Sequence, residues 1–113
     1  MLPALNRLRS SKDFARTTKV GHRASTASLV IYLREEKDLP LAPQIGFIVS
    51  KVVGGSVTRH RIARQLRHAA AEQIELIPPH SHVVVRVIKN EGDFSAELLQ
   101  GITKIVHKLG VQR

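Results

Sequence analysis

The amino-acid sequence predicts an α+β two-layer sandwich, a small sheet with helices packed on one face, and an α/β arrangement is the alternative. Two long segments repeat their apolar residues with helical spacing, whereas three shorter segments are rich in valine, isoleucine and leucine, as strands are. With 113 residues, the chain is long enough for one core and too short for two. We therefore expect a single domain over residues 1–113, with a short helix followed by strand, strand, helix, strand and helix.

The first predicted helix lies within residues 10–21. Ser10 or Ser11 can accept a hydrogen bond from the backbone of the first turn, Phe14 offers an apolar side, and Gly21 is a typical helix end. The segment is therefore expected to form a short amphipathic helix before the sheet begins.

Two strands are predicted next, over residues 26–34 and 44–51. The first is β-branched and apolar with a polar end, and the second carries Gly46, which indicates a bulge or a close approach of another backbone or side chain. The segment between them is charged and contains two prolines, so we expect a loop there.

The second half of the chain predicts a helix, a strand and a final helix. The first of these helices covers residues 56–77 and ends where two prolines follow. Residues 82–89 are almost continuously Val and Ile, which is typical of a buried strand. The last helix is capped by Asp93 or Ser95 and ends at Gly110.

The charge balance is strongly positive. Lys and Arg number 18 against 9 Asp and Glu, a formal net charge of +9. Such a chain suits a polyanionic partner, and nucleic acid is favoured over a membrane surface because the basic helix carries no Trp or Phe to insert. No apolar run is long enough to span a bilayer, so we expect a cytoplasmic protein, and we predict no protein partner.

The predicted helix over residues 56–77 has an apolar and a basic side. At about 100° per residue, five basic residues fall in one arc of roughly 120° beside the apolar arc. The apolar arc holds Ile62, Leu66, Ala69, Ala70 and Ile74, and the basic arc holds His60, Arg61, Arg64, Arg67 and His68. No acid occurs between Leu39 and Ala71, whereas a face that serves only solubility mixes both signs. A nucleic-acid contact is therefore favoured, and a solvated face is the alternative.

The chemistry of the side chains favours binding over catalysis. Guanidinium groups bind phosphates through two parallel hydrogen bonds, and the glycine turn at residues 54–55 leaves backbone N–H groups free at a helix start. Phe14 and Tyr32 are candidates either for the core or for stacking on unpaired bases. His80 and His82 lack a third ligand nearby in the sequence, so we predict no metal site, and no catalytic set is visible.

A resemblance to a known family lies in residues 45–70, which read IGFIVSKVVGGSVTRHRIARQLRHAA. This segment resembles the signature of the bacterial ribonuclease P protein subunit, a strand ending in Ser-Lys, then Gly, a small residue and Val, then two arginines flanking one residue on a basic helix. The similarity extends upstream over LPALNRLRSSKDFARTTKVG and downstream to a VVVRV strand and the last helix.

The resemblance implies the non-catalytic protein subunit of an RNA endonuclease. In that family the protein binds a large catalytic RNA, and the complex removes the 5′ leader of precursor tRNA with Mg²⁺ held mainly by RNA. The residues implied to bind the catalytic RNA are Lys51, Arg59, His60, Arg61, Arg64 and Arg67, assisted by Arg7 and Arg9. The residues implied to line a cleft for the leader are Phe14, Tyr32 and Ser50.

The resemblance also implies a mixed sheet of about four strands and an unusual left-handed crossover between the strands predicted at residues 44–51 and 82–89. Five positions depart from the family pattern: Thr18 replaces an aromatic, Val52 replaces a second Lys, Gly55 and His60 each replace Asn, and Ala63 replaces a basic residue. A structural RNA-binding protein, such as a ribosomal protein or an RNA chaperone, is the alternative function.

Overall fold

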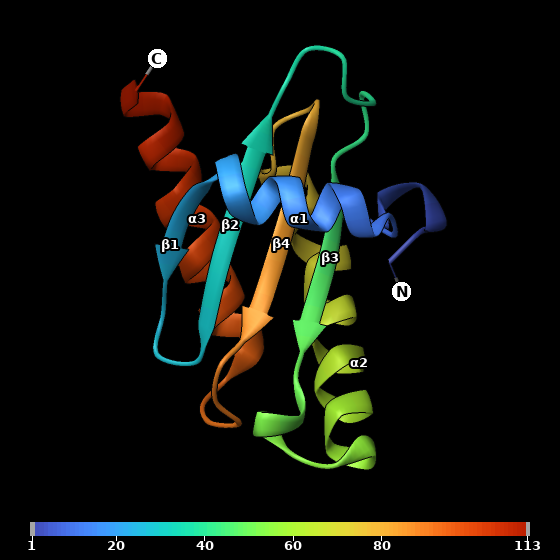
Figure 1. Cartoon of the computed structure of the whole chain (residues 1–113). Coiled ribbons are helices and arrows are strands. Elements are labelled where there is room, and N and C mark those ends of the chain that lie inside the picture. The colour runs from blue at the N-terminus through green and yellow to red at the C-terminus, as the bar shows by residue number, and fades with distance from the viewer. Residues whose placement is uncertain (1, 113) are drawn as a thin grey trace.

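A four-stranded mixed sheet forms the centre of the protein (Figure 1). The computed structural model describes residues 2–112. The strand order across the sheet is β1-β2-β4-β3. The pairs β1–β2 and β2–β4 are antiparallel, and β3 is parallel to β4. The strands are β1 (His22–Ser25), β2 (Leu29–Glu35), β3 (Gln44–Val49) and β4 (Ser81–Val87).

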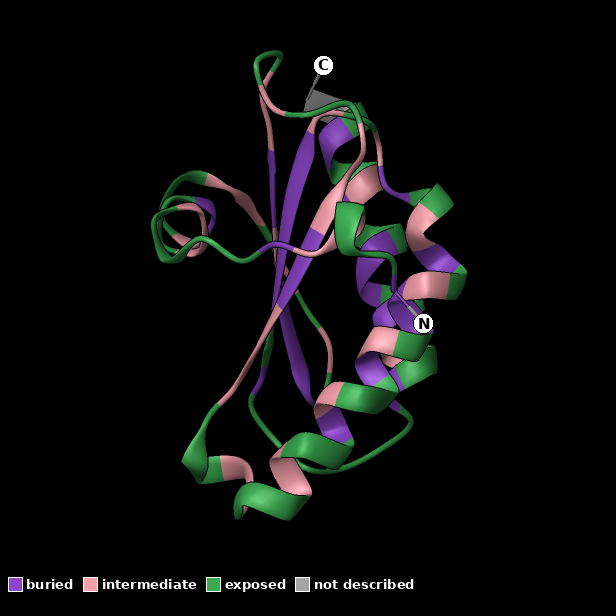
Figure 2. Ribbon diagram, turned by 90° about the vertical axis from the view of Figure 1, so that its right-hand side faces the viewer, coloured by how far each residue is buried: buried purple, intermediate pink, exposed green. Residues whose placement is uncertain are grey.

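The α-helices lie on both faces of this sheet. They are α1 (Ser11–Val20), α2 (Ser56–Gln73) and α3 (Phe94–Gln112), and short 3-10 turns η1, η2 and η3 occupy Ala4–Asn6, Lys51–Val53 and Ile74–Leu76. Figure 2 shows α2 and α3 together on one side of the sheet and α1 alone on the other. The expected packing on one face therefore holds for α2 and α3, whereas α1 crosses the opposite face.

The position of α1 follows from the composition of the central strands. Val30 of β2 and Val84 of β4 are buried on the face opposite to α2 and α3. A strand that is apolar on both faces needs cover on both. The continuous valine run of β4 is thus explained by helices above and below it.

The connection from β3 through α2 to β4 is left-handed. In Figure 1 both strands point downward, and the chain passes from β3 on the right to β4 on its left. Figure 2 places α2 behind the sheet in that view. A right-handed crossover is the general rule for parallel neighbours. The expectation of a left-handed crossover is therefore confirmed.

The main core lies between the sheet and the α2–α3 pair. The predicted apolar side of α2 is buried, including Ile62 and Leu66, and Ile74 is half-buried against the same core. The strand residues that meet it alternate along each strand, as the pleat requires. They include Leu29, Ile31, Leu33, Ile45, Val83 and Val85, and α3 contributes Leu98, Ile102, Ile105 and Leu109.

Several element boundaries differ from the predictions. The strand expected from residue 26 begins at Leu29, because Thr26 donates a 2.7 Å hydrogen bond to the Glu97 carboxylate and the chain turns there. The last helix continues past Gly110 to Gln112. Ser10 and Asp93 are the actual caps, since their side-chain oxygens accept from Asp13 N and Ala96 N respectively.

Both outer strands are partly covered. On the β1 side, Lys104 Nζ and Lys108 Nζ of α3 donate to the carbonyl oxygens of Ser25 and Arg23, at 3.3 and 3.1 Å. On the β3 side, the N-terminal segment adds a single parallel bridge between Arg7 and Ile45. These contacts satisfy edge peptide groups that would otherwise face solvent.

Candidate nucleic-acid interface

The basic side of α2 is exposed along most of its length. His60, Arg61 and Arg64 are exposed, and Arg67 is half-buried at the border of the arc. The two borders of the arc line different hollows, because Arg61 faces the start of α3 and Arg67 faces the edge of β3. The predicted basic face is therefore present, and it reaches both flanks of the helix.

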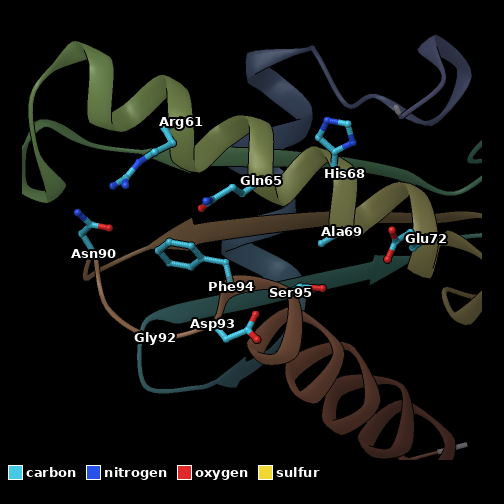
Figure 3. A pocket seen from close by; sticks show the side chains of 10 residues that line it. All are labelled: Arg61, Gln65, His68, Ala69, Glu72, Asn90, Gly92, Asp93, Phe94 and Ser95. Atoms are coloured by element: carbon cyan, nitrogen blue, oxygen red, sulfur yellow. The ribbon is translucent and has the colours of Figure 1, made fainter.

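Figure 3 shows the hollow on the α3 flank, a groove of about 420 Å³. The Arg61 side chain of α2 is directed toward Asn90, and His68 of α2 lines the groove further along the helix. Glu72 and Asp93 also line the groove. The groove is thus polar with both charge signs, in contrast to the outer side of α2.

Arg59 lies apart from the exposed arc. It is half-buried, and its Nε atom is buried without a hydrogen-bond partner among the residues that the structure describes. A desolvated guanidinium N–H favours an acceptor.

The start of α2 leaves backbone donors available. The helix begins after Gly55 with no side-chain cap, and Gly54 before it has φ 157°, a conformation that glycine adopts readily. The exposed Lys51 lies in the turn η2 just upstream. Free N–H groups at a helix start with a nearby cation form a favourable place for a phosphate.

The face of the sheet that carries α1 holds the predicted aromatic residues. The Phe14 ring packs directly on Gly46, so closely that a Cβ at Gly46 would collide with it. Gly46 and Tyr32 both pair with Val84, from opposite sides. Phe14 and Tyr32, both half-buried, therefore occupy one row across the sheet with Val84 between them.

Beyond that row none of the described helices crosses this face of the sheet (Figure 1), and Arg86 lies there. We call this face, with Phe14, Tyr32, Ser50 and Arg86, the open sheet face. Arg86 of β4 pairs with Val30 and Ile48 and is exposed, although its strand neighbours are buried. Ser50, also exposed, follows the end of β3. Arg86 was not among the residues predicted from the sequence, and the signal for it was a single charge within an otherwise apolar strand.

Buried polar contacts hold α1 on the sheet. Arg34 of β2 is only 6% exposed, and its guanidinium lies 3.5 Å from Asp13 Oδ1 of α1 and 3.4 Å from Glu36 Oε1. Glu36 Oε1 also lies 3.4 Å from Arg16 of α1. Arg34 further donates to His82 Nδ1 at 2.9 Å. Burial, more than any neighbouring charge, lowers the pKa of His82 below its ordinary value of 6.5.

Arg7 and Arg9 lie at the outer edge of β3. Arg7 is bridged to Ile45, and its Nε donates to Leu2 O at 3.0 Å. Together with Arg67 they line a hollow of about 220 Å³, here named the edge pocket. The two arginines predicted to assist RNA binding are thus joined to α2 through Arg67.

The two histidines weighed as metal ligands have protein partners. His80 Nδ1 lies 2.7 Å from Leu39 O, and His82 is bound by Arg34. Within residues 2–112, no three His, Cys, Asp or Glu side chains cluster in a way that could hold a metal ion. Among the described helices, none has the length and apolarity needed to cross a bilayer.

Fold and surface together define a class: a small basic α+β protein that presents an arginine-rich helix and an aromatic-bearing open sheet face, two surfaces of the kind that bind RNA. The family model described as Ribonuclease P matches residues 2–110. The chain therefore belongs to the ribonuclease P protein family.

Individual proteins agree with this assignment. The ribonuclease P protein component of Streptomyces avermitilis is 41% identical over 96% of this chain and 95% of its own length. That of Mycobacterium bovis is 36% identical over the whole of both chains. Among solved structures, the RNase P protein from Thermotoga maritima superposes with a TM-score of 0.70 at 23% identity, covering 83% of this chain and 92% of its own. The Staphylococcus aureus RNase P protein gives 0.65 at 25% identity, covering 96% and 95%.

Proposed function

We propose that this protein binds the catalytic RNA of ribonuclease P through α2 and the 5′ leader of precursor tRNA through the open sheet face. The observation that carries the proposal is the presence of two separate RNA-suited surfaces of different chemistry. The first carries exposed cationic side chains of a helix, whereas the second carries aromatic side chains on one face of the sheet. A folded RNA and a single strand are the partners that these surfaces respectively fit.

The α2 surface suits a folded RNA because its groups recognise phosphates. Arg61 and Arg64 are exposed and have no ion-pair partner among residues 2–112, so their guanidinium groups remain available. Arg59, His60 and Arg67 extend the same surface, and Lys51 lies near the free helix start. Arg7 and Arg9 continue it toward the N-terminus.

The open sheet face suits a single strand. Phe14 and Tyr32 offer aromatic rings in one row, and unpaired bases stack on such rings. Arg86 and Ser50 lie further along the same path, where a cation and a hydroxyl can bind the sugar-phosphate backbone. We propose these four residues as the leader-binding set.

The chemical step is assigned to the RNA. The side chains on both surfaces are mainly cationic and aromatic, and Mg²⁺ prefers carboxylate, carbonyl and water oxygens. These residues therefore do not fit a magnesium site, and we expect the ions to be held by RNA and substrate phosphates. The protein's part is to bind and orient. A cytoplasmic location belongs to the same proposal, because precursor tRNA is found there.

A reconstituted cleavage assay tests the proposal. Precursor tRNA and the cognate catalytic RNA are incubated with and without the protein over a range of Mg²⁺ concentrations. The protein should lower the Mg²⁺ needed for half-maximal cleavage, and it should increase affinity for precursor tRNA more than for leaderless tRNA. Unchanged Mg²⁺ dependence would refute the proposal, and co-purification with ribosomal subunits would favour the structural RNA-binding alternative.

A further inference from the structure

The edge pocket lies between the two proposed RNA surfaces and has its own chemistry. Its volume of about 220 Å³ is below the roughly 300 Å³ at which pockets for drug-sized ligands begin, and well above the ≈ 30 Å³ share of one water. A single planar ring system is the size of ligand that this volume suits.

Apolar and aromatic side chains form the inner part of the edge pocket. Phe14 of α1 and Phe47 of β3 both line it and both are half-buried. Ala63 of α2 also lines the edge pocket, and its side chain is small. Rings and methyl groups favour a ligand with a flat, weakly polar face.

The strand edge adds hydrogen-bonding groups. Ile45 O accepts from Leu8 N at 3.0 Å, so Ile45 turns its peptide groups outward. Alternate residues of a strand direct these groups to the same edge, so Phe47 also turns its N–H and C=O outward. In the described chain, no backbone hydrogen bond continues the pairing from the N-terminal segment to Phe47. An adjacent donor and acceptor therefore face the edge pocket.

The edge pocket also has three cationic side chains. Arg7, Arg9 and Arg67 line the edge pocket, and no ion pair holds any of them within residues 2–112. Arg9 is exposed, whereas Arg7 and Arg67 are half-buried. Cations beside an apolar hollow fit a ligand that joins a flat ring to a phosphate.

We propose that the edge pocket receives one unpaired nucleobase of a bound RNA, with Arg7, Arg9 and Arg67 holding the flanking phosphates. The inference rests on the proposed function and extends it to one nucleotide at a site where α2, α1 and the N-terminal segment meet. Both the catalytic RNA and the leader are chains of such nucleotides, so the experiment separates these two sources.

The direct test is an NMR titration of the full chain with each of the four nucleoside 5′-monophosphates at millimolar concentration. We expect amide shifts at Phe47 and Ala63 that Ala63→Leu abolishes and that the matched Ala63→Ser variant retains. Inorganic phosphate is the control ligand. The same shifts with phosphate alone, or no shifts with any nucleotide, would overturn the proposal.

The RNA source is identified in the reconstituted complex. Ala63→Leu should weaken binding either of the catalytic RNA or of leader-bearing precursor tRNA by roughly ten-fold, the effect of losing one stacked base. Arg9→Gln, at the exposed rim, should weaken the same RNA without altering core packing. If neither variant changes either affinity, the edge pocket takes no base.

A matched variant keeps this failure distinct from failure of the proposed function. Arg61→Glu combined with Arg64→Glu acts on the α2 surface away from the edge pocket. Loss of RNA binding by this double variant, with normal binding by Ala63→Leu, would reject only the edge-pocket site. Normal binding by both would reject the function itself.

Discussion

Arg34 Nη2 lies 2.9 Å from His82 Nδ1, and both side chains are buried beneath α1. Arginine has only N–H donors, so Nδ1 must accept and the histidine must be neutral with its proton on Nε2. Protonation would place a second cation against the guanidinium. The pair therefore links the protonation state of one residue to the packing of α1 on the sheet.

Stability should depend on pH through His82. The pKa of His82 is lower in the folded protein than its ordinary value of 6.5, so as pH falls the unfolded chain takes up the proton first. The contribution of His82 to the free energy of unfolding is therefore fully present above about pH 6.5 and is lost as pH falls through the folded pKa. Urea unfolding at a series of pH values should show this decline. In His82→Asn, whose side-chain oxygen can accept from Arg34 without titrating, the decline should be smaller. An equal decline in both proteins would contradict the assignment.

Removing the Arg34 guanidinium should loosen α1. We expect Arg34→Met to lower the free energy of unfolding by about 1–3 kcal/mol, because a buried donor network is removed while its carboxylate partners remain partly solvated. The affinity of the protein for leader-bearing precursor tRNA should fall too, since α1 carries Phe14, which we propose binds the leader. Arg16→Gln is the control: that side chain is 59% exposed, and the expected cost is below about 0.5 kcal/mol. Equal effects of the two changes would show that Arg34 does not anchor α1.

Substitutions at Phe14 and Gly46 should have non-additive effects on the free energy of unfolding, because the ring packs on the glycine. Gly46→Ala places a Cβ into the ring, and such overpacking costs about 1–3 kcal/mol. Adding Phe14→Leu should recover part of that stability, which a double-mutant cycle measures by chemical denaturation. Gly55→Ala is the matched control, since nothing lies within 4 Å of a Cβ built there. Strict additivity of the two changes would indicate that the ring is not held on Gly46.

Charge reversal on α2 should weaken RNA binding and its salt dependence together. For each phosphate that the protein no longer neutralises, the slope of log K against log salt falls by about 0.7–0.9. Arg61→Glu with Arg64→Glu should therefore reduce the slope by about 1.4 or more. Filter binding to the catalytic RNA at several salt concentrations measures both quantities.

The control for the charge reversal is Lys37→Glu, in the exposed loop before β3. This change should leave affinity and slope nearly unchanged, because the loop belongs to neither proposed RNA surface. A circular dichroism spectrum identical to that of the unaltered protein confirms that the fold of each variant is intact. Lys37→Glu changes the net charge half as much as the double variant does. A reduction of the slope by about 0.7 in Lys37→Glu would therefore show that net charge, rather than the α2 surface, governs the binding.

The sequence predicts what depends on local periodicity. The apolar side of α2, the basic arc beside it and the buried strand β4 all follow from residue spacing within one segment, and all are present. The strand β1 could not be predicted from residue spacing, because its four residues have no apolar pattern and form a strand through their pairing with β2.

What the sequence does not predict is set by contacts between distant segments. The place of α1 depends on Arg34 and His82, and the row that joins Phe14 to Tyr32 depends on the register of three strands. The edge pocket combines the N-terminal segment, α1, β3 and α2. No single segment carries a signal for it, because its walls meet only after folding.

The lysines at the β1 edge have a consequence for the protein before it meets RNA. An exposed strand edge is a template for other chains, and a valine-rich sheet makes that pairing attractive. Because Lys104 and Lys108 occupy edge carbonyls and add positive charge there, pairing of two copies through this edge would break these hydrogen bonds and bring like charges together. Part of the chain's positive charge thus works against self-association through β1.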